Sequence, residues 1–257
     1  MLGNGGITGS LSTSSKITNN GTLNFNHSDN IVQGSAFGSL ITGSGKVIQS
    51  GTGTTKLTGV NDFTGDTEIT AGTLEATAAD TLKGTNLVTI SGGTLLLSGS
   101  GNRIKDTAGM IISTNSLGGP ALTLSGTVSE SVGALTLNSA GTSVMDFGAG
   151  SAVFTFADSS GAPWSGLMQI WNWTGALTGG GSDQLFFGSS GSGLTPAQLA
   201  SISFIDPNEL GSGSYGAQLL GTGELIPVPE PSFWLAGGIL LGIAGLHHRR
   251  RTTAGME

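Results

Sequence analysis

The chain has 257 residues, of which 46 are glycine, and only 10% of its residues are charged. Glycine, serine, threonine and asparagine favour turns and strands, which excludes a helical bundle, while an apolar content of 37% is enough to build a core. The net charge of −7 argues against nucleic acid as a partner, and the absence of cysteine excludes disulfides and cysteine-ligated zinc.

The N-terminal residues, MLGNGGITGS, have neither the basic nor the apolar stretch of a secretory signal peptide. We therefore expect either a true start further upstream or export by another route.

Residues 1–140 consist of short apolar-alternating segments separated by glycine, asparagine and serine, which is typical of strands joined by tight corners. Gly-Thr-Leu recurs at 21, 72 and 93, and Gly-Lys-Val stands at 45, so that Leu23, Val47, Leu74 and Leu95 follow one another at 24, 27 and 21 residues. An interval in this range returns each strand to the same face of a solenoid. The segment therefore predicts a parallel β-helix.

Residues 51–76 carry the densest pattern of the chain. Its recurring positions are Gly51, Gly53, Leu57, Gly59, Asn61, Phe63, Thr64, Gly65, Thr67, Ile69, Ala71, Gly72, Thr73 and Leu74. At these positions the segment closely resembles the autotransporter-associated β-strand repeat, with one departure, because Thr55 stands where an apolar residue is usual. The resemblance implies a passenger-type β-helix at a bacterial surface.

Residues 141–226 contain more aromatic strands, and we expect them to form a β-rich cap, because an open solenoid end exposes apolar core and unpaired strand edges. A short helix is predicted to begin with Thr195 as its N-cap and Pro196 at its first position.

Candidate chemistry is sparse, and we expect no catalytic residues, no metal site and no cofactor. The carboxylates Asp62, Asp66 and Glu68 could flank a glycosidic bond, or could simply keep the strands soluble. The loop Gly179–Asp183 has some likeness to calcium-binding repeats, but a flexible glycine loop is the simpler interpretation. None of the three histidines, His27, His247 and His248, has an evident nucleophile or acid partner.

Trp171 and Trp173 are candidates for stacking on sugar rings, since strand alternation would place them on one face. The alternative is that they belong to the core of the cap.

Residues 228–251 join a proline-bracketed acid, an apolar run and three arginines. The run predicts a short transmembrane helix over 232–246, with Arg249, Arg250 and Arg251 as the cytoplasmic basic anchor, because basic residues favour that side of a membrane. The body would then lie outside the inner membrane.

With Pro229, Glu230 and Pro231 directly before the apolar run, residues 228–251 resemble a PEP-CTERM sorting signal. The resemblance implies recognition of these three residues by an exosortase, transient residence in the inner membrane, and transfer to the cell surface or extracellular matrix of a Gram-negative bacterium. The expected function is that of an exported structural or interaction protein, with extracellular polysaccharide as one candidate partner. The alternatives are a surface polysaccharide lyase or hydrolase built on the β-helix, and a carbohydrate-binding module.

Overall fold

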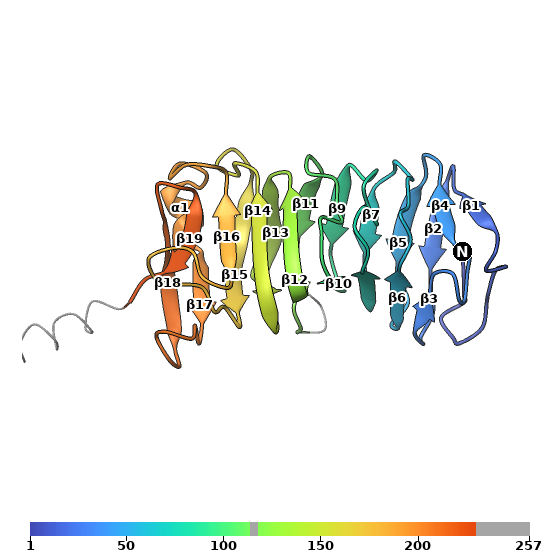
Figure 1. The fold of residues 1–257 in the computed structure, drawn as a ribbon, viewed down its shortest axis with the longest axis horizontal. Coiled ribbons are helices and arrows are strands. Elements are labelled where there is room, and N and C mark those ends of the chain that lie inside the picture. The colour runs from blue at the N-terminus through green and yellow to red at the C-terminus, as the bar shows by residue number, and fades with distance from the viewer. Residues whose placement is uncertain (114–117, 230–257) are drawn as a thin grey trace, which may run out of the picture.

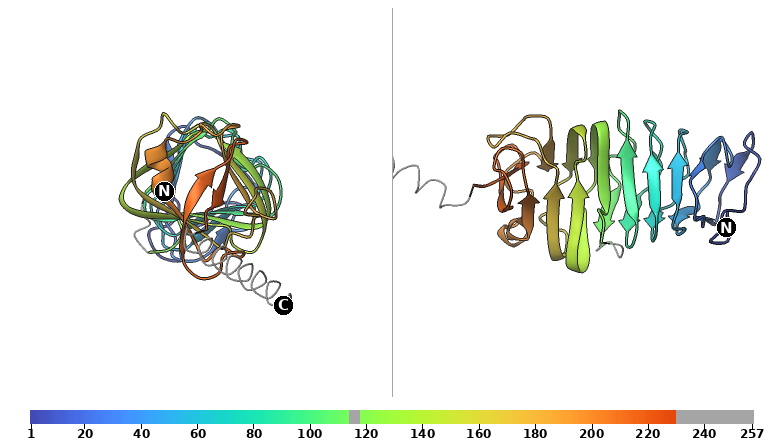
Figure 2. Two further views of the ribbon diagram at one scale, coloured as in Figure 1. Left: turned by 90° about the vertical axis from the view of Figure 1, so that its left-hand side faces the viewer. Right: turned by 90° about the horizontal axis from the view of Figure 1, so that it is seen from below.

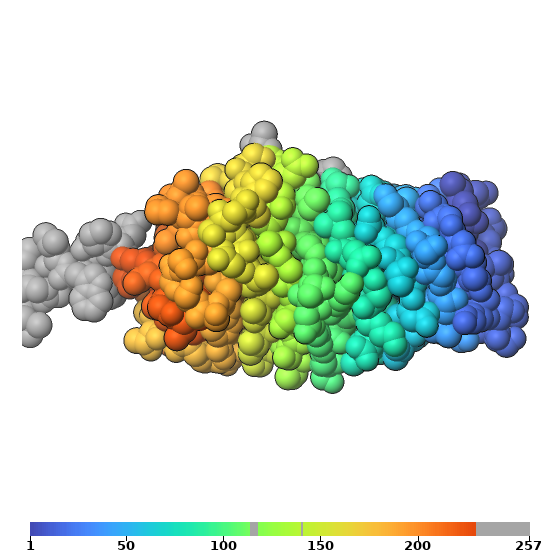
Figure 3. Space-filling model, turned by 90° about the horizontal axis from the view of Figure 1, so that it is seen from above, coloured from blue at the N-terminus to red at the C-terminus, as the bar shows by residue number. Residues whose placement is uncertain are grey.

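The computed structural model describes residues 1–113 and 118–229. They form an elongated all-β solenoid, in which short strands wind around a long axis and each coil stacks on the one before (Figure 1). The space-filling view shows the colours of the chain in successive bands along this axis, so residues close in sequence share one slice of the molecule (Figure 3). The predicted parallel β-helix is confirmed as a β-solenoid.

Three stacks of strands form the faces of the solenoid, with parallel pairing from coil to coil. The first face contains β2 (Thr22–Phe25), β5 (Lys46–Gln49), β7 (Thr67–Ile69), β9 (Leu87–Ile90), β11 (Gly109–Ile112) and the start of β13 (Leu135–Asp146). The second contains β3 (Ile31–Val32), β6 (Thr54–Leu57), β8 (Thr73–Ala76), β10 (Thr94–Ser98), the start of β12 (Leu122–Val132), the end of β13, β15 (Trp164–Trp171) and β17 (Ile202–Ile205). The third contains β1 (Lys16–Thr18), β4 (Leu40–Thr42), the end of β12, β14 (Gly150–Phe156) and β16 (Gln184–Phe187).

Side chains alternate strictly between the interior and the surface along most strands, as in β6, β8 and β9. Because the coils pair in register, each inward position stacks on its equivalent in the next coil and forms a continuous buried row. One such row on the second face consists of Ile31, Thr55, Leu74, Leu95, Leu122, Met145, Ile170 and Phe204. These rows make up the core.

The register corrects the series of leucines and valines from which the period was derived. Leu23 and Val47 are paired on the first face, whereas Leu74 and Leu95 are paired on the second. The interval of 27 residues between Val47 and Leu74 is therefore a full coil plus the step from one face to the next. The true partner of Val47 in the following coil is Thr67, 20 residues later.

The C-terminal end of the solenoid is closed by antiparallel strands. The hairpin of β18 (Ser214–Leu219) and β19 (Glu224–Pro227) crosses this end and pairs with β17 on one side and β16 on the other (Figure 2). Parallel pairing continues up to β17, and residue 140 lies inside β13. The cap therefore begins later than expected, because residues 141–205 add further coils to the same body.

The predicted short helix is confirmed as α1 (Pro196–Ala200), with Thr195 as its N-cap in a capping box with Gln198. Within residues 1–113 and 118–229, no helix has the length and apolar character needed to cross a membrane. The expected transmembrane helix at 232–246 lies outside these residues.

The buried hydroxyl of Thr55 allows a test of how an inward position contributes to stability. The Thr55 side chain is 1% exposed and stacks between the apolar Ile31 and Leu74, and its Oγ1 has no hydrogen-bond partner among the described residues. We expect Thr55→Val to stabilise the protein by about 1 kcal/mol, because valine has the same shape and removes a buried unsatisfied hydroxyl. Urea unfolding followed by circular dichroism measures the change.

Thr67→Val is the matched control for this substitution. Thr67 is equally buried, but its hydroxyl lies 3.2 Å from that of Thr85 and shares a hydrogen bond with it. The same substitution should therefore destabilise the protein at Thr67. Equal effects at the two positions would contradict the interpretation.

Candidate functional site

The residues of the expected sorting signal lie almost entirely outside the described part of the chain. This holds for Glu230, Pro231 and Arg249–Arg251. Pro229 is half-buried two residues after the end of β19, and the amide of the intervening Val228 donates to the carbonyl of Gly216 at 2.9 Å. The described body thus ends at the residue that precedes the acid of the signal.

Trp171 and Trp173 do not form the two-ring platform expected from strand alternation. The strand β15 ends at Trp171, and Asn172 adopts the left-handed conformation with φ of 55°, which turns the chain. Trp173 is consequently 1% exposed and packs edge-on against Phe204, with the ring centroids 5.3 Å apart. Trp173 belongs to the core, and Trp171 alone remains at the surface.

Trp171 lines an open pocket of about 260 Å³ together with Asn172, Ile205 and Asp206. We call this the Trp171 pocket. Trp171 and Ile205 point outward from neighbouring coils and are register partners, and the two polar residues stand at the corner that follows. Asp206, like Asn172, is left-handed, with φ of 50°.

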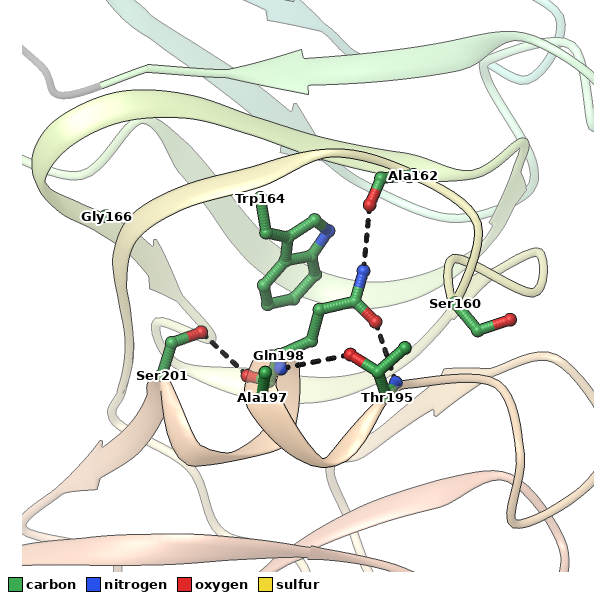
Figure 4. A pocket seen from close by; sticks show the side chains of 8 residues that line it. All are labelled: Ser160, Ala162, Trp164, Gly166, Thr195, Ala197, Gln198 and Ser201. Carbon is green, nitrogen blue, oxygen red and sulfur yellow. Dashed lines mark hydrogen bonds between the residues drawn. The ribbon is translucent and has the colours of Figure 1, made fainter.

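A second pocket, of about 270 Å³, lies between α1 and the start of β15 (Figure 4). The side chain of Gln198 lies beside the Trp164 indole and donates to the carbonyls of Ser159 and Ala162 at 2.8 and 2.9 Å. Its Oε1 accepts from the amide of Thr195 at 2.7 Å. The side-chain amide that lines this pocket therefore anchors the helix to the solenoid.

The glycine loop before β16 is held in place by hydrogen bonds to two carboxylates, those of Asp183 and Glu224. Gly179, Gly180 and Gly181 all have positive φ. The buried Asp183 accepts from the amides of Ala152 and Thr174 at 3.0 and 2.8 Å and from the hydroxyl of Thr174 at 2.7 Å, and Glu224 accepts from the amide of Gly180 at 2.7 Å. This arrangement fits a structural loop held by carboxylates that accept backbone hydrogen bonds.

His27 is buried at 3% exposure in the first coils, and its Nδ1 lies 3.0 Å from Oδ1 of Asp29. Its Nε2 has no hydrogen-bond partner in residues 1–113 and 118–229. His247 and His248 lie outside the described residues. In the part of the chain that is described, no three histidine or acidic side chains come together in a way that could hold a metal ion.

The candidate carboxylates of the dense repeat lie on different parts of the surface. Glu68 is 3.1 Å from the ammonium group of Lys46 in the preceding coil, whereas Asp62 is exposed and Asp66 is half-buried at the corner before β7. A further pair joins Glu75 to Lys56 at 3.0 Å. Partly exposed pairs of this kind contribute at most about 1 kcal/mol, and both Glu68 and Glu75 are engaged in such contacts between adjacent coils.

The geometry of these coils is that of a repeat in which every strand rests on its equivalent one coil away. Residues 47–76 match the model of the passenger-associated-transport-repeat. The match covers the expected repeat at 51–76 and supports the autotransporter-associated assignment. Comparison with curated proteins and with solved structures returned no match. A passenger-associated repeat within a β-solenoid fits a surface-exposed protein.

Two glycines of the passenger-associated repeat are required by the close approach of adjacent coils. A Cβ on Gly53 would lie 2.0 Å from the carbonyl oxygen of Asp29, and one on Gly65 would lie 2.3 Å from that of Gly45. Both contacts are with backbone atoms that cannot move aside. At these two positions, where the corner rests directly on the preceding coil, only glycine fits.

The asparagine of the passenger-associated repeat joins three coils. Asn61 is completely buried, and its Oδ1 accepts from the amide of Ile41 at 2.9 Å and from Nε2 of Gln33 at 2.6 Å. Its Nδ2 donates to the carbonyls of Gly59 and Thr81, each at 3.2 Å. One side chain thus satisfies backbone groups at a corner where strand pairing is interrupted.

A buried ion pair that the sequence did not indicate lies further along the solenoid. Neither Arg103 nor Glu130 has an exposed side chain, and their charged groups are 3.6 Å apart. The Glu130 carboxylate also accepts from the amides of Arg103 and Ile104 at 2.9 and 2.8 Å, while the guanidinium donates to the carbonyl of Ser98 at 2.8 Å. Glu130 occupies an inward position of β12 and stacks on Phe154 of the next coil. Alternation alone would assign an apolar residue there.

Burial raises the pKa of the Glu130 carboxyl from its ordinary 4.5 to about 7, although the two backbone amides and Arg103 act in the opposite direction. Between pH 4.5 and pH 7 the folded protein retains a proton that the unfolded chain has released. Stability is therefore expected to fall as the pH rises through this window, by up to about 3 kcal/mol. Urea unfolding at several pH values measures this slope.

Glu130→Gln is the control for the pH dependence. The glutamine side chain keeps an oxygen that accepts from the backbone amides but does not titrate. The difference in the free energy of unfolding between the wild type and the variant should therefore change between pH 4.5 and pH 7. Parallel stability curves for the two proteins would show that Glu130 is not the titrating group.

Proposed function

We propose that the chain is an exported structural or interaction module, displayed at the surface of a Gram-negative bacterium and not an enzyme. The observation that carries the proposal is the parallel solenoid with its passenger-associated repeat at 47–76. Inward positions stack from coil to coil and leave one long outer surface for contacts. The bonded carboxylates Glu68, Glu75 and Asp183 fit structural roles better than a lyase or hydrolase site.

We further propose that residues 228–251 are a sorting signal of the PEP-CTERM type. Pro229, Glu230 and Pro231 would be the residues read by an exosortase-like enzyme in the inner membrane. The apolar run 232–246 would hold the protein there transiently, and Arg249–Arg251 would keep its end in the cytoplasm. Prolines on both sides of the acid keep the backbone extended and available to the enzyme.

The closed end of the solenoid supports this arrangement. The described residues end at Pro229, shortly after β19, which belongs to the antiparallel cap at the end where β16, β18 and β19 are already paired (Figure 2). Removal of the tail beyond residue 229 leaves the strand pairs of the described body intact. A processing enzyme could thus cut the tail without unfolding the solenoid.

We expect Glu230→Ala to block processing when the chain, provided with an export leader, is co-produced with a cognate exosortase in a Gram-negative host. The full-length form should accumulate in the inner-membrane fraction, while the wild type should appear shortened and outside that fraction. Immunoblots of separated fractions measure the outcome. Glu209→Ala, which removes an exposed acid from the body, is the matched control and should behave like the wild type.

Identical processing of Glu230→Ala and the wild type would overturn the sorting proposal. An unprocessed wild-type chain in the presence of the exosortase would do the same. Neither result bears on the solenoid itself, which is tested by the stability measurements.

A further inference from the structure

Among the described residues of its outward row, Trp171 is the only aromatic side chain. Its partners in the neighbouring coils are Asp146 and Ile205, and the row continues through Thr123 on one side and Ser214 on the other. A half-buried indole with shorter neighbours offers a flat apolar surface at the edge of an open pocket. Its Nε1 is bonded to Oε1 of Gln169 at 3.1 Å, which fixes the ring.

The polar side of the Trp171 pocket is formed by two residues in a costly backbone conformation. Asn172 and Asp206 occupy the same corner of successive coils, with φ of 55° and 50°, where glycine would be the unstrained choice. Asn172 donates to Oδ1 of Asp146 at 2.7 Å, and Oδ1 of Asp206 accepts from the amide of Gly213 at 2.7 Å. These bonds hold both side chains in place.

Each side chain keeps hydrogen-bonding capacity toward the pocket. Within the described residues, Oδ1 of Asn172 and Oδ2 of Asp206 have no hydrogen-bond partner. This distinguishes the Trp171 pocket from the one beside α1, where both functional atoms of the Gln198 amide are bonded. Strained residues with fixed orientation and free acceptors are a feature of binding sites.

The charge around the pocket restricts the class of ligand. Residues 106–229 contain no lysine or arginine, so an anionic ligand would find no counter-charge there and would be repelled by the acids. Hydroxyl groups, by contrast, can donate to the free oxygens while the ring face of a sugar covers the indole. The acids of this part are Asp106, Glu130, Asp146, Asp158, Asp183, Asp206, Glu209 and Glu224.

We propose that the Trp171 pocket is a binding site for a neutral saccharide, in which the indole of Trp171 stacks on a sugar ring and Asn172 and Asp206 accept hydrogen bonds from its hydroxyl groups. The volume of about 260 Å³ suits one or two sugar units of a longer chain that runs over the open surface. This site does not depend on the sorting route, because it lies on the body of the protein.

Isothermal titration of the purified full-length chain tests the site, with cellohexaose, laminarihexaose, chitohexaose and mannohexaose as neutral probes. We expect at least one of them to bind with a Kd of about 1 mM or tighter. Trp171→Ala should weaken this binding about tenfold through loss of stacking. Asn172→Gly should weaken it about threefold, because glycine keeps the left-handed backbone and removes only the side chain.

Two variants serve as controls that preserve binding. Trp164→Phe changes the tryptophan of the other pocket, and Asp80→Gly replaces a left-handed residue, with φ of 61°, at a distant coil. Thermal unfolding confirms that each variant is folded. Oligogalacturonate is titrated as an anionic probe for comparison. The proposal would be overturned if none of the four neutral probes bound, or if oligogalacturonate bound more tightly than they did. Undiminished binding by folded Trp171→Ala or Asn172→Gly would also overturn it.

Discussion

The structure depends on one constraint, the register in which each strand lies directly on its equivalent in the preceding coil. Parallel hydrogen bonds fix the distance between coils, so inward side chains must stack in rows whatever the length of the corners between them. Apolar rows such as the one from Ile31 to Phe204 turn this geometry into a continuous core. A shift of one residue in the pairing of a strand would turn its core side chains to the surface. Burial of the apolar side chains therefore selects the observed register.

The register constrains the corners between strands most strongly. Coils approach so closely at Gly53 and Gly65 that no Cβ fits, and backbone groups that leave the strands must find other partners. Asn61 supplies them for three coils at once, and the Glu130 carboxylate does the same for two amides of the preceding coil. The high content of glycine and small polar residues follows from these requirements, with no need to invoke disorder.

The sequence predicts this architecture well at the level of the repeat and less well at the level of single residues. The β-solenoid and the cap of α1 follow from local pattern and turn chemistry. The face of each strand and the spacing of true register partners depend on corner lengths, which the pattern of Leu23, Val47, Leu74 and Leu95 does not reveal. Trp173 turns inward because Asn172 is left-handed, and no alternation rule anticipates such a turn. The burial of Glu130 is also not predictable from alternation, because it depends on backbone amides that are distant in the sequence.

Inward and outward rows are under different physical demands, and this difference indicates where function should be sought on a solenoid. Inward positions must fit both neighbours in their row, so even Thr55 follows the shape of an apolar residue. Outward positions are free of that requirement, and one row changes along the molecule from the ion pair of Lys56 and Glu75 to the aromatic Trp171. Two of the three described left-handed residues other than glycine, Asn172 and Asp206, stand beside Trp171 in the coils just before the antiparallel cap. The regular coils thus act as a scaffold, whereas the last coils hold an aromatic side chain and left-handed corner residues that the repeat itself does not require.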